Sequence, residues 1–315
     1  MRGHSRTPEQ SLLERWSEAL ATPQFQANNV TLDALITALA PAAERSFQRL
    51  IQALFREGLL DPSTRTYDEH GQCWLALPDQ NRLRFEHLRP GRMASWDVRG
   101  RVTLLRDDHP DLNIQFPSQL LTLLNRSLES PADPEVLDRL NTEIDDSFVN
   151  DTLCLAFHEQ WTLKLHTAMG PTHQSNLLSY LKHDPSVTNP TSTLEQWGTL
   201  GHPWHPNYKT KLGLNTDQVI DFSPEFEARF PVFLCALHRQ FAHVEMLAGT
   251  ADYWQWWQQH FPQAARQLTA QLTAQGLEAG DYLPLPAHPW QARQELPQLF
   301  ANEIGDRLLV LTDIV

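Results

Sequence analysis

The sequence predicts an α+β fold that is mostly helical and carries one antiparallel meander. Two observations support this: long segments whose apolar residues recur at helical spacing, and a stretch of short alternating segments between turn residues at 66–106. Of the 315 residues, 41% are hydrophobic and 20% are charged, which is typical of a globular protein. This length suggests about two units, which we place at residues 1–189 and 190–315.

The helical part of the prediction begins near the N-terminus, over residues 8–60. One apolar run follows Thr31, which suits the position before a helix because its side chain can cap the first turn. A second run ends at Gly58, which suits the position after a helix because glycine tolerates a left-handed backbone. Residues 134–168 are expected to form another helical region.

A further helix is predicted over residues 223–249, whose apolar residues fall on one stripe. Ser223 would cap this helix, Pro224 would occupy its first position and Gly249 would end it. A kink is expected at Pro231, because proline removes a backbone hydrogen bond inside a helix.

The segment YWQWWQQHF, residues 253–261, is rich in aromatic residues. Trp254 and Trp257 stand at helical spacing, so we interpret them as core residues, with a platform for stacking a nucleobase as the alternative. The sequence then ends on RLLVLTDIV, an apolar run typical of a β-strand. Because a buried strand needs a partner on each side, we expect this last sheet to be incomplete.

The predicted meander contains seven arginines. We interpret them as residues of solvated strand faces, where the arginine stem covers apolar surface. The alternative is a sheet that faces an anion, since arginine grips carboxylate or phosphate through two hydrogen bonds. These residues are Arg82, Arg84, Arg89, Arg92, Arg99, Arg101 and Arg106.

The net charge of −13 argues against nonspecific binding of nucleic acid, which requires a cationic surface. It leaves room for a small anion in a local cationic pocket. No segment approaches the roughly 18 consecutive apolar residues of a membrane span, and the polar N-terminus lacks the apolar region of a signal peptide. Cys73, Cys154 and Cys235 have apolar neighbours and form no C-x-x-C motif, so we expect reduced, buried thiols in a cytoplasmic protein.

Several common catalytic signatures are missing from the sequence. We find neither G-x-x-x-x-G-K-[ST] nor G-x-G-x-x-G, and G-x-S-x-G and H-E-x-x-H are absent as well. Glycine is scarce, at 13 residues. Any nucleotide chemistry must therefore use a scaffold other than a glycine-rich loop.

The segment GHPWHPNYKTKLG, residues 201–213, gathers residues that are poor core formers. His202 and His205 both precede proline, which favours an extended or polyproline II backbone. Because polyproline II has about three residues per turn, the two imidazoles are predicted to share a face. Pro206 would then begin a helical turn that carries Lys209.

Three interpretations of this segment compete: a surface loop, a zinc site and an anion site. A zinc site needs a third ligand from elsewhere, and the lysine beside it would repel a cation. A site for phosphate or carboxylate is favoured by Lys209 and Lys211, and by the dipole of the expected helical turn. A second His-Pro corner occurs at His288 within LPLPAHPWQ, where the plain interpretation is a proline-rich connection anchored by Trp290.

Together the two segments resemble the IucA/IucC family of siderophore synthetases, which work independently of nonribosomal peptide synthetases. The shared pattern is E-Q-x(4)-GHPxHPxxKxxxG, followed about 75 residues later by LPxHPWQ. The likeness covers about residues 190–291. The matching residues are Glu195, Gln196, Gly201, His202, Pro203, His205, Pro206, Lys209, Gly213, Pro286, His288, Pro289, Trp290 and Gln291.

This resemblance implies a fold and an activity. The family has a cupped-hand fold of thumb, fingers and palm, and its members use ATP and Mg²⁺ to adenylate a carboxylate of citrate or a citryl compound. An amine or hydroxylamine then displaces AMP, and members are commonly homodimers. The resemblance places six residues of this chain at ATP or the carboxylate: His202, His205, Lys209, Lys211, His288 and Gln291.

The sequence departs from the family pattern in two places. Family members usually read K-x-R where this chain has Lys209-Thr210-Lys211, so the side chain at 211 keeps its charge but lacks the bidentate fork of arginine. Family members also continue well beyond LPxHPWQ, with a Ser-x-Arg-Thr motif and the residues that bind citrate and magnesium. We therefore expect the N-terminal half of a synthetase, weak by itself in catalysis; a non-catalytic binding module that needs a second chain is the alternative.

Overall fold

The computed structural model describes residues 7–77, 80–106, 109–128, 130–173, 176–184, 187–199, 201–249 and 252–312. The chain divides into two compact units, Met1–Ala228 and Arg229–Val315, which we describe separately. The domain boundary that we placed at residue 190 stays a prediction. None of the described helices combines the length and hydropathy needed to cross a membrane.

The first unit is built around two long helices, α3 (Leu32–Arg56) and α5 (Pro134–His173), which pack against each other. The predicted signals at the ends of α3 are confirmed: Thr31 accepts a hydrogen bond from the Ala34 amide, and Gly58 adopts a positive φ of 71° just after the helix. The shorter helices of this unit are α1 (Pro8–Ala21), α2 (Pro23–Ala27), α4 (Pro117–Ser127), α6 (Leu177–His183), α7 (Pro190–Trp197) and α8 (Thr216–Phe222).

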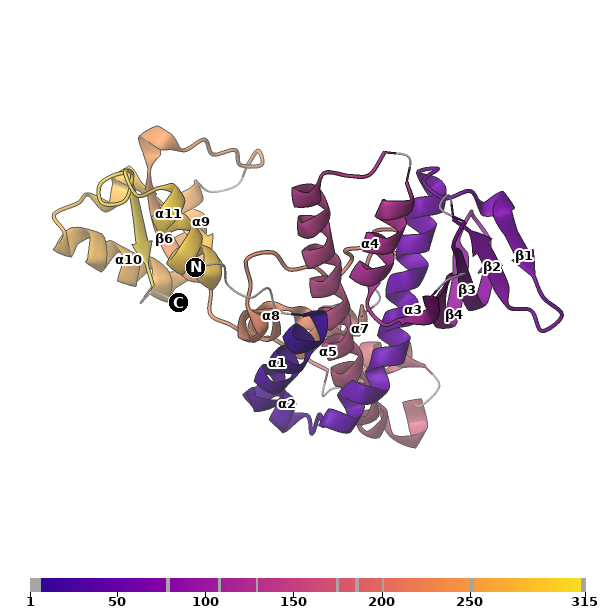
Figure 1. Cartoon of the computed structure of the whole chain (residues 1–315). Helices are drawn as coiled ribbons and strands as arrows, with labels where there is room; N and C mark the ends of the chain where they lie inside the picture. The colour runs from indigo at the N-terminus through magenta and orange to yellow at the C-terminus, as the bar shows by residue number, and fades with distance from the viewer. Residues whose placement is uncertain are drawn as a thin grey trace. The chain divides into compact units, whose positions relative to one another are not determined.

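The predicted meander is confirmed as a five-stranded antiparallel sheet with strands in sequence order. Its inner face, which includes Leu83, Phe85 and Leu88, is buried in one core cluster with the C-terminal half of α3. Helix α3 therefore lies between the sheet and α5 (Figure 1). The strands are β1 (Arg65–Tyr67), β2 (Cys73–Ala76), β3 (Arg82–Pro90), β4 (Trp96–Arg106) and β5 (His109–Ile114).

Most arginines of the meander have local partners on the strands. Arg82 and Arg84 lie over the Trp74 ring, at 5.4 and 6.0 Å from its centre. Arg101 pairs with Glu86 at 2.8 Å, and Arg99 pairs in the same way with Asp97. These contacts agree with the interpretation as solvated strand faces and give no indication of a sheet that faces an anion.

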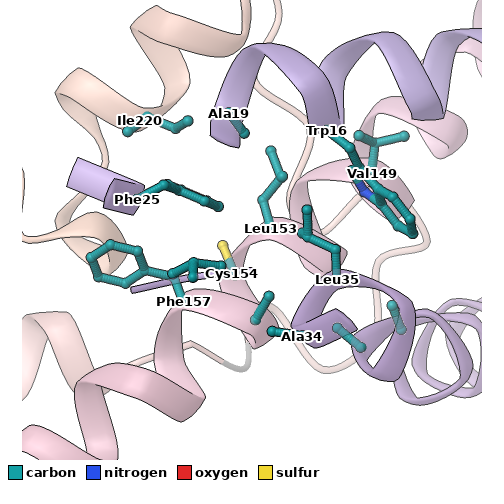
Figure 2. Packing of buried hydrophobic residues seen from close by; sticks show 14 of the residues in the cluster. Trp16, Ala19, Phe25, Ala34, Leu35, Val149, Leu153, Cys154, Phe157 and Ile220 are labelled. Carbon is teal, nitrogen blue, oxygen red and sulfur yellow. The ribbon is translucent and has the colours of Figure 1, made fainter. Parts of the chain in front are cut away.

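A second core cluster joins α1, α2, the N-terminal half of α3 and the middle of α5. Figure 2 shows Phe25 and Phe157 facing each other in this cluster, and their ring centres are 5.5 Å apart. Cys154 lies in the same cluster, and all three cysteines are buried and free, as predicted. This cluster fixes the part of α5 on which the candidate site rests.

The second unit contains a three-stranded antiparallel sheet in the order β7-β6-β8. The predicted C-terminal strand is confirmed as β8 (Leu308–Leu311), and Trp254 and Trp257 are buried core residues, as predicted. The other elements of this unit are β6 (Phe233–His238), α9 (Tyr253–His260), α10 (Pro262–Ala274), β7 (Tyr282–Ala287), a π-helical turn (Gln291–Glu295) and α11 (Leu296–Leu299).

The helix predicted over residues 223–249 is wrong. Pro224 begins only a short 3₁₀ turn that ends at Phe226, and Glu227 has a left-handed φ of 55°. Proline at 231 disfavours a helical residue before it, and β6 then pairs with strands on both sides. The central part of the apolar run, Phe233–His238, is therefore a strand whose first four residues are buried, a pattern that spacing alone does not separate from a helix.

The first turn of α4 contacts Asp145 of α5, whose carboxylate accepts a 3.4 Å hydrogen bond from the Ser118 amide. Burial raises the pKa of Asp145 to about 6, although the hydrogen bonds from Ser118 act in the opposite direction. A carboxyl pKa that is higher in the folded than in the unfolded chain means that folding favours the protonated form. Asp145 therefore lowers stability as the pH rises from about 4 to about 6.

We predict that Asp145→Asn makes the protein more stable at pH 7, by about 1–3 kcal/mol, because it removes the cost of burying an ionised carboxylate. Urea unfolding of wild type and variant at several pH values measures the difference. The two proteins should converge below about pH 4, where the carboxyl is protonated in both states. A difference of the same size at pH 4 and pH 8 would contradict this explanation.

Candidate functional site

The candidate site of the first unit is the HPWHP loop, which we define as residues 201–211. The imidazole rings of His202 and His205 lie side by side, with centres 4.2 Å apart and planes inclined by 40°. Both side chains are exposed. The predicted arrangement of two imidazoles on one face of the loop is therefore confirmed.

The turn predicted at Pro206 is present, but it does not continue into a helix. Residues 206–209 form a single turn, closed by a 3.2 Å hydrogen bond from the Thr210 amide to the Asn207 carbonyl. The backbone amides on either side of Thr210 donate hydrogen bonds to side chains of α5. The Lys209 amide donates to Ser147 Oγ and the Lys211 amide donates to Asp146 Oδ2, each at 2.9 Å. A helix dipole therefore does not contribute to this site.

Helix α3 holds the first half of the loop through side chains that donate to backbone carbonyls. Arg49 Nε donates to the His202 carbonyl at 2.9 Å, and Gln52 Nε2 donates to the Pro203 carbonyl at 3.3 Å. Arg45 donates to the Thr199 carbonyl just before the loop, at 3.1 Å. These three residues recur at helical spacing on one face of α3, so this face of the helix holds the backbone of the loop.

Helix α5 holds the second half of the loop. The Tyr208 hydroxyl donates to Asp151 Oδ2 at 2.6 Å, and the Asn150 amide donates to the Lys209 carbonyl at 2.8 Å. The Arg49 guanidinium lies over the Tyr208 ring, 3.8 Å from its centre. This contact links α3 and α5 through the loop. Burial raises the pKa of Asp151, although Arg45 Nε lies 3.2 Å from Asp151 Oδ2 and acts in the opposite direction. The ionised form of this carboxylate therefore depends on its partners.

Lys209 is buried, and its ammonium pairs with Glu225 Oε1 at 2.5 Å. Burial lowers the pKa of Lys209, but Glu225 and Asp151 among other neighbours outweigh burial and raise it overall. The pKa of Glu225 is lowered, because the attraction of Lys209 outweighs the effect of burial. The predicted contact of Lys209 with a bound anion stays a prediction, and in this structure the ammonium already holds a carboxylate.

The second His-Pro corner belongs to the second unit, directly after β7. His288 is half-buried, and its ring meets the Phe230 ring edge-on at 4.7 Å between centres. Burial lowers the pKa of His288. Gln291 is exposed at the start of the π-helical turn. The structure thus gathers His202, His205, Lys209 and Lys211 on one unit, and His288 and Gln291 on the other.

Sequence reasoning missed the residues that hold the loop in place. Arg45, Arg49 and Gln52 carried a usable signal, since they interrupt an apolar helix at intervals of four and three residues. Glu225 gave no such signal, because it lies in the segment predicted to be a helix, residues 223–249. Within the described ranges, no group of three or more His, Cys, Asp or Glu residues is placed to hold a metal ion.

Comparisons with known proteins bear on this fold. The petrobactin biosynthesis protein AsbB of Bacillus anthracis superposes with a TM-score of 0.65 at 17% identity, covering 96% of this chain and 44% of that protein. The aerobactin synthetase IucC of Klebsiella pneumoniae gives 0.59 at 17% identity, with 88% and 45% covered. The fold is therefore that of the N-terminal part of the siderophore synthetases, as the resemblance implied.

Residues 190–314 match the family model described as "IucA / IucC family", and through them we assign the chain to that family. An uncharacterized protein of Sinorhizobium fredii, y4xN, is 32% identical over 269 residues, or 84% of this chain and 43% of its own length. Staphyloferrin A synthase of Staphylococcus aureus is 26% identical over 277 residues, or 86% and 46%. The chain thus spans somewhat less than half the length of these relatives.

A double-mutant cycle is expected to reveal strong coupling between Lys209 and Glu225. Lys209→Met should lower the free energy of unfolding by about 3–5 kcal/mol, because it leaves a buried carboxylate without its partner. The double variant Lys209→Met/Glu225→Leu should recover most of this loss, because apolar residues of similar size replace the whole pair. Urea unfolding at pH 7 measures the free energy of unfolding of the wild type, of both single variants and of the double variant.

Arg101→Met is the matched control for that cycle, because it breaks the exposed ion pair with Glu86. Its cost should stay at about 1 kcal/mol or less, as for other surface pairs. If the double variant is as unstable as the sum of the two single variants, Lys209 and Glu225 are not coupled, and the ion pair does not hold the loop.

Proposed function

We propose that this protein acts in siderophore biosynthesis, as an ATP-dependent ligase that joins a citrate-type carboxylate to an amine or hydroxylamine. The observation that carries the proposal is the pair of imidazoles on a loop fixed to α3 and α5, in a chain whose relatives include one named Staphyloferrin A synthase. One further relative is named D-ornithine--citrate ligase, and is 29% identical over 116 residues.

The use of ATP has separate support. The structure of ATP-bound aerobactin synthetase IucA of Klebsiella pneumoniae has a similar fold, with a TM-score of 0.53 at 17% identity to this chain. In the proposed reaction a carboxylate oxygen attacks the α-phosphorus of ATP and pyrophosphate leaves. An amine then attacks the acyl carbon, its proton is lost, and AMP leaves with the bonding electrons.

The residues of this chain would serve binding and charge stabilisation in that reaction. The exposed imidazoles of His202 and His205 would donate hydrogen bonds to phosphate or carboxylate oxygens, with Lys211 adding positive charge. For His288 and Gln291 we propose a contact with ATP or with the carboxylate. Mg²⁺ is expected to accompany ATP, but the described residues offer no group of carboxylates that fits it, so we assign none of them to magnesium.

Exchange of pyrophosphate into ATP in the presence of citrate tests the proposal. We expect exchange from the longest product of the gene that contains this chain, and little or none from the 315-residue chain by itself. His205→Ala should reduce exchange about 100-fold, because it removes a donor to the charge that develops on the α-phosphate.

His87→Ala is a matched control, since His87 lies on the meander beside Asp97 and outside the loop. It should leave the exchange rate unchanged. Absence of exchange with citrate and with other polycarboxylates, in a well-folded product that contains Ser-x-Arg-Thr, would rule out the enzyme and favour a binding module of the same fold.

A further inference from the structure

The two His-Pro-Trp sequences of this chain form the same local hydrogen bond. In the first unit the Trp204 amide donates to Nδ1 of His202 at 3.2 Å. In the second unit the Trp290 amide donates to Nδ1 of His288, also at 3.2 Å. Two segments of unrelated surroundings thus place a backbone N–H against the same ring nitrogen.

This hydrogen bond determines where a neutral imidazole carries its proton. A backbone N–H can only donate, so the Nδ1 atom that faces it must be the acceptor and must be unprotonated. The ring proton of the neutral histidine then resides on Nε2, which becomes a hydrogen-bond donor. The proline between the two residues contributes because it keeps the histidine backbone extended. The N–H of the tryptophan can then point back to the histidine ring.

The two histidines are held at a second point as well. The His202 carbonyl accepts from Arg49 at 2.9 Å, and the His288 carbonyl accepts from the Ala292 amide at 2.9 Å. Each residue is thus fixed at its carbonyl and at its ring. At His202, whose side chain is exposed, the Nε2 edge is the side of the ring that these contacts leave open for a ligand.

We propose that each His-Pro-Trp turn locks its histidine in the Nε2–H tautomer, so that the exposed His202 acts as a neutral donor to an oxygen of an anionic ligand. Neither histidine then serves as a metal ligand or as a general base through Nε2. Both roles need a lone pair on Nε2, which would move the proton to Nδ1 and set it against the tryptophan N–H. The tautomer stands by itself; the anionic ligand, phosphate or carboxylate, rests on the proposed function.

His205 provides a contrast within the same loop. It also precedes proline, but Asn207 follows in place of tryptophan, and residues 206–209 form a turn of their own. Among the residues that the structure describes, His205 has a ring contact with His202 and no hydrogen bond to its ring nitrogens. His205 is therefore expected to populate both tautomers.

Long-range ¹H–¹⁵N correlation spectra of the 315-residue chain, labelled on its histidine rings, test this proposal. At about pH 8, where imidazoles are neutral, His202 and His288 should each show a protonated Nε2 and an unprotonated Nδ1. His205 should show averaged signals. Single His→Gln variants assign the resonances, and His238, whose Nδ1 accepts from the Gln240 amide at 3.3 Å, is the positive standard.

Two variants of Trp204 separate the backbone amide from the side chain. Trp204→Pro removes the N–H and should convert His202 to averaged tautomer signals, while His288 keeps its own. Trp204→Phe retains the N–H and should leave the tautomer of His202 unchanged. A protonated Nδ1 or averaged signals at His202 and His288 in the wild type, or unchanged His202 signals in Trp204→Pro, would overturn the lock.

Titrations with citrate and with ATP test the ligand separately. The Nε2–H signal of His202 should shift on binding, and a shift with both ligands or with either alone supports an anion ligand. If neither anion moves this signal, the donor role is wrong, although the tautomer lock stands. Because the lock is read from spectra without ligand, its failure is distinguishable from failure of the proposed enzyme activity.

Discussion

The burial of charge beneath the HPWHP loop is the constraint on which the first unit depends. Asp151 of α5 and Lys209 of the loop are both withdrawn from water, and each would be costly to bury alone. Asp151 is compensated by Arg45 of α3 and by the Tyr208 hydroxyl, and Lys209 is compensated by Glu225. The loop, α3, α5 and the turn after α8 must therefore be in place together, because removing any one leaves a charge without its partner.

That arrangement explains which groups of the loop are left for function. Its carbonyls and amides are occupied by Arg49, Gln52, Ser147 and other residues of the two helices. The imidazoles of the loop remain exposed above a fixed backbone. A site built in this way is preorganised, since binding a ligand does not require the loop to find its conformation first.

The sequence predicted the elements whose signals are local. The caps of α3, the meander, the pairing of His202 with His205 and the last strand follow from spacing and from turn residues. The segment 223–249 was misread because a strand buried on both faces lacks alternation. The pairing of Tyr208 with Asp151 could not be predicted for another reason: the two residues are 57 positions apart, and such contacts exist only once the chain has folded.

The chemistry of the loop follows from the division of work between its buried and its exposed groups. Buried charges such as Lys209 are paired with carboxylates in this structure, so they fix the geometry of the loop. A neutral Nε2–H donor at His202 has the opposite character, because it binds an oxygen without needing a proton from solvent and without repelling its neighbour His205. Two positively charged imidazoles with ring centres 4.2 Å apart would repel each other, whereas a neutral ring at His202 does not repel its neighbour. The proposed tautomer lock would thus let the two imidazoles share one face of the loop.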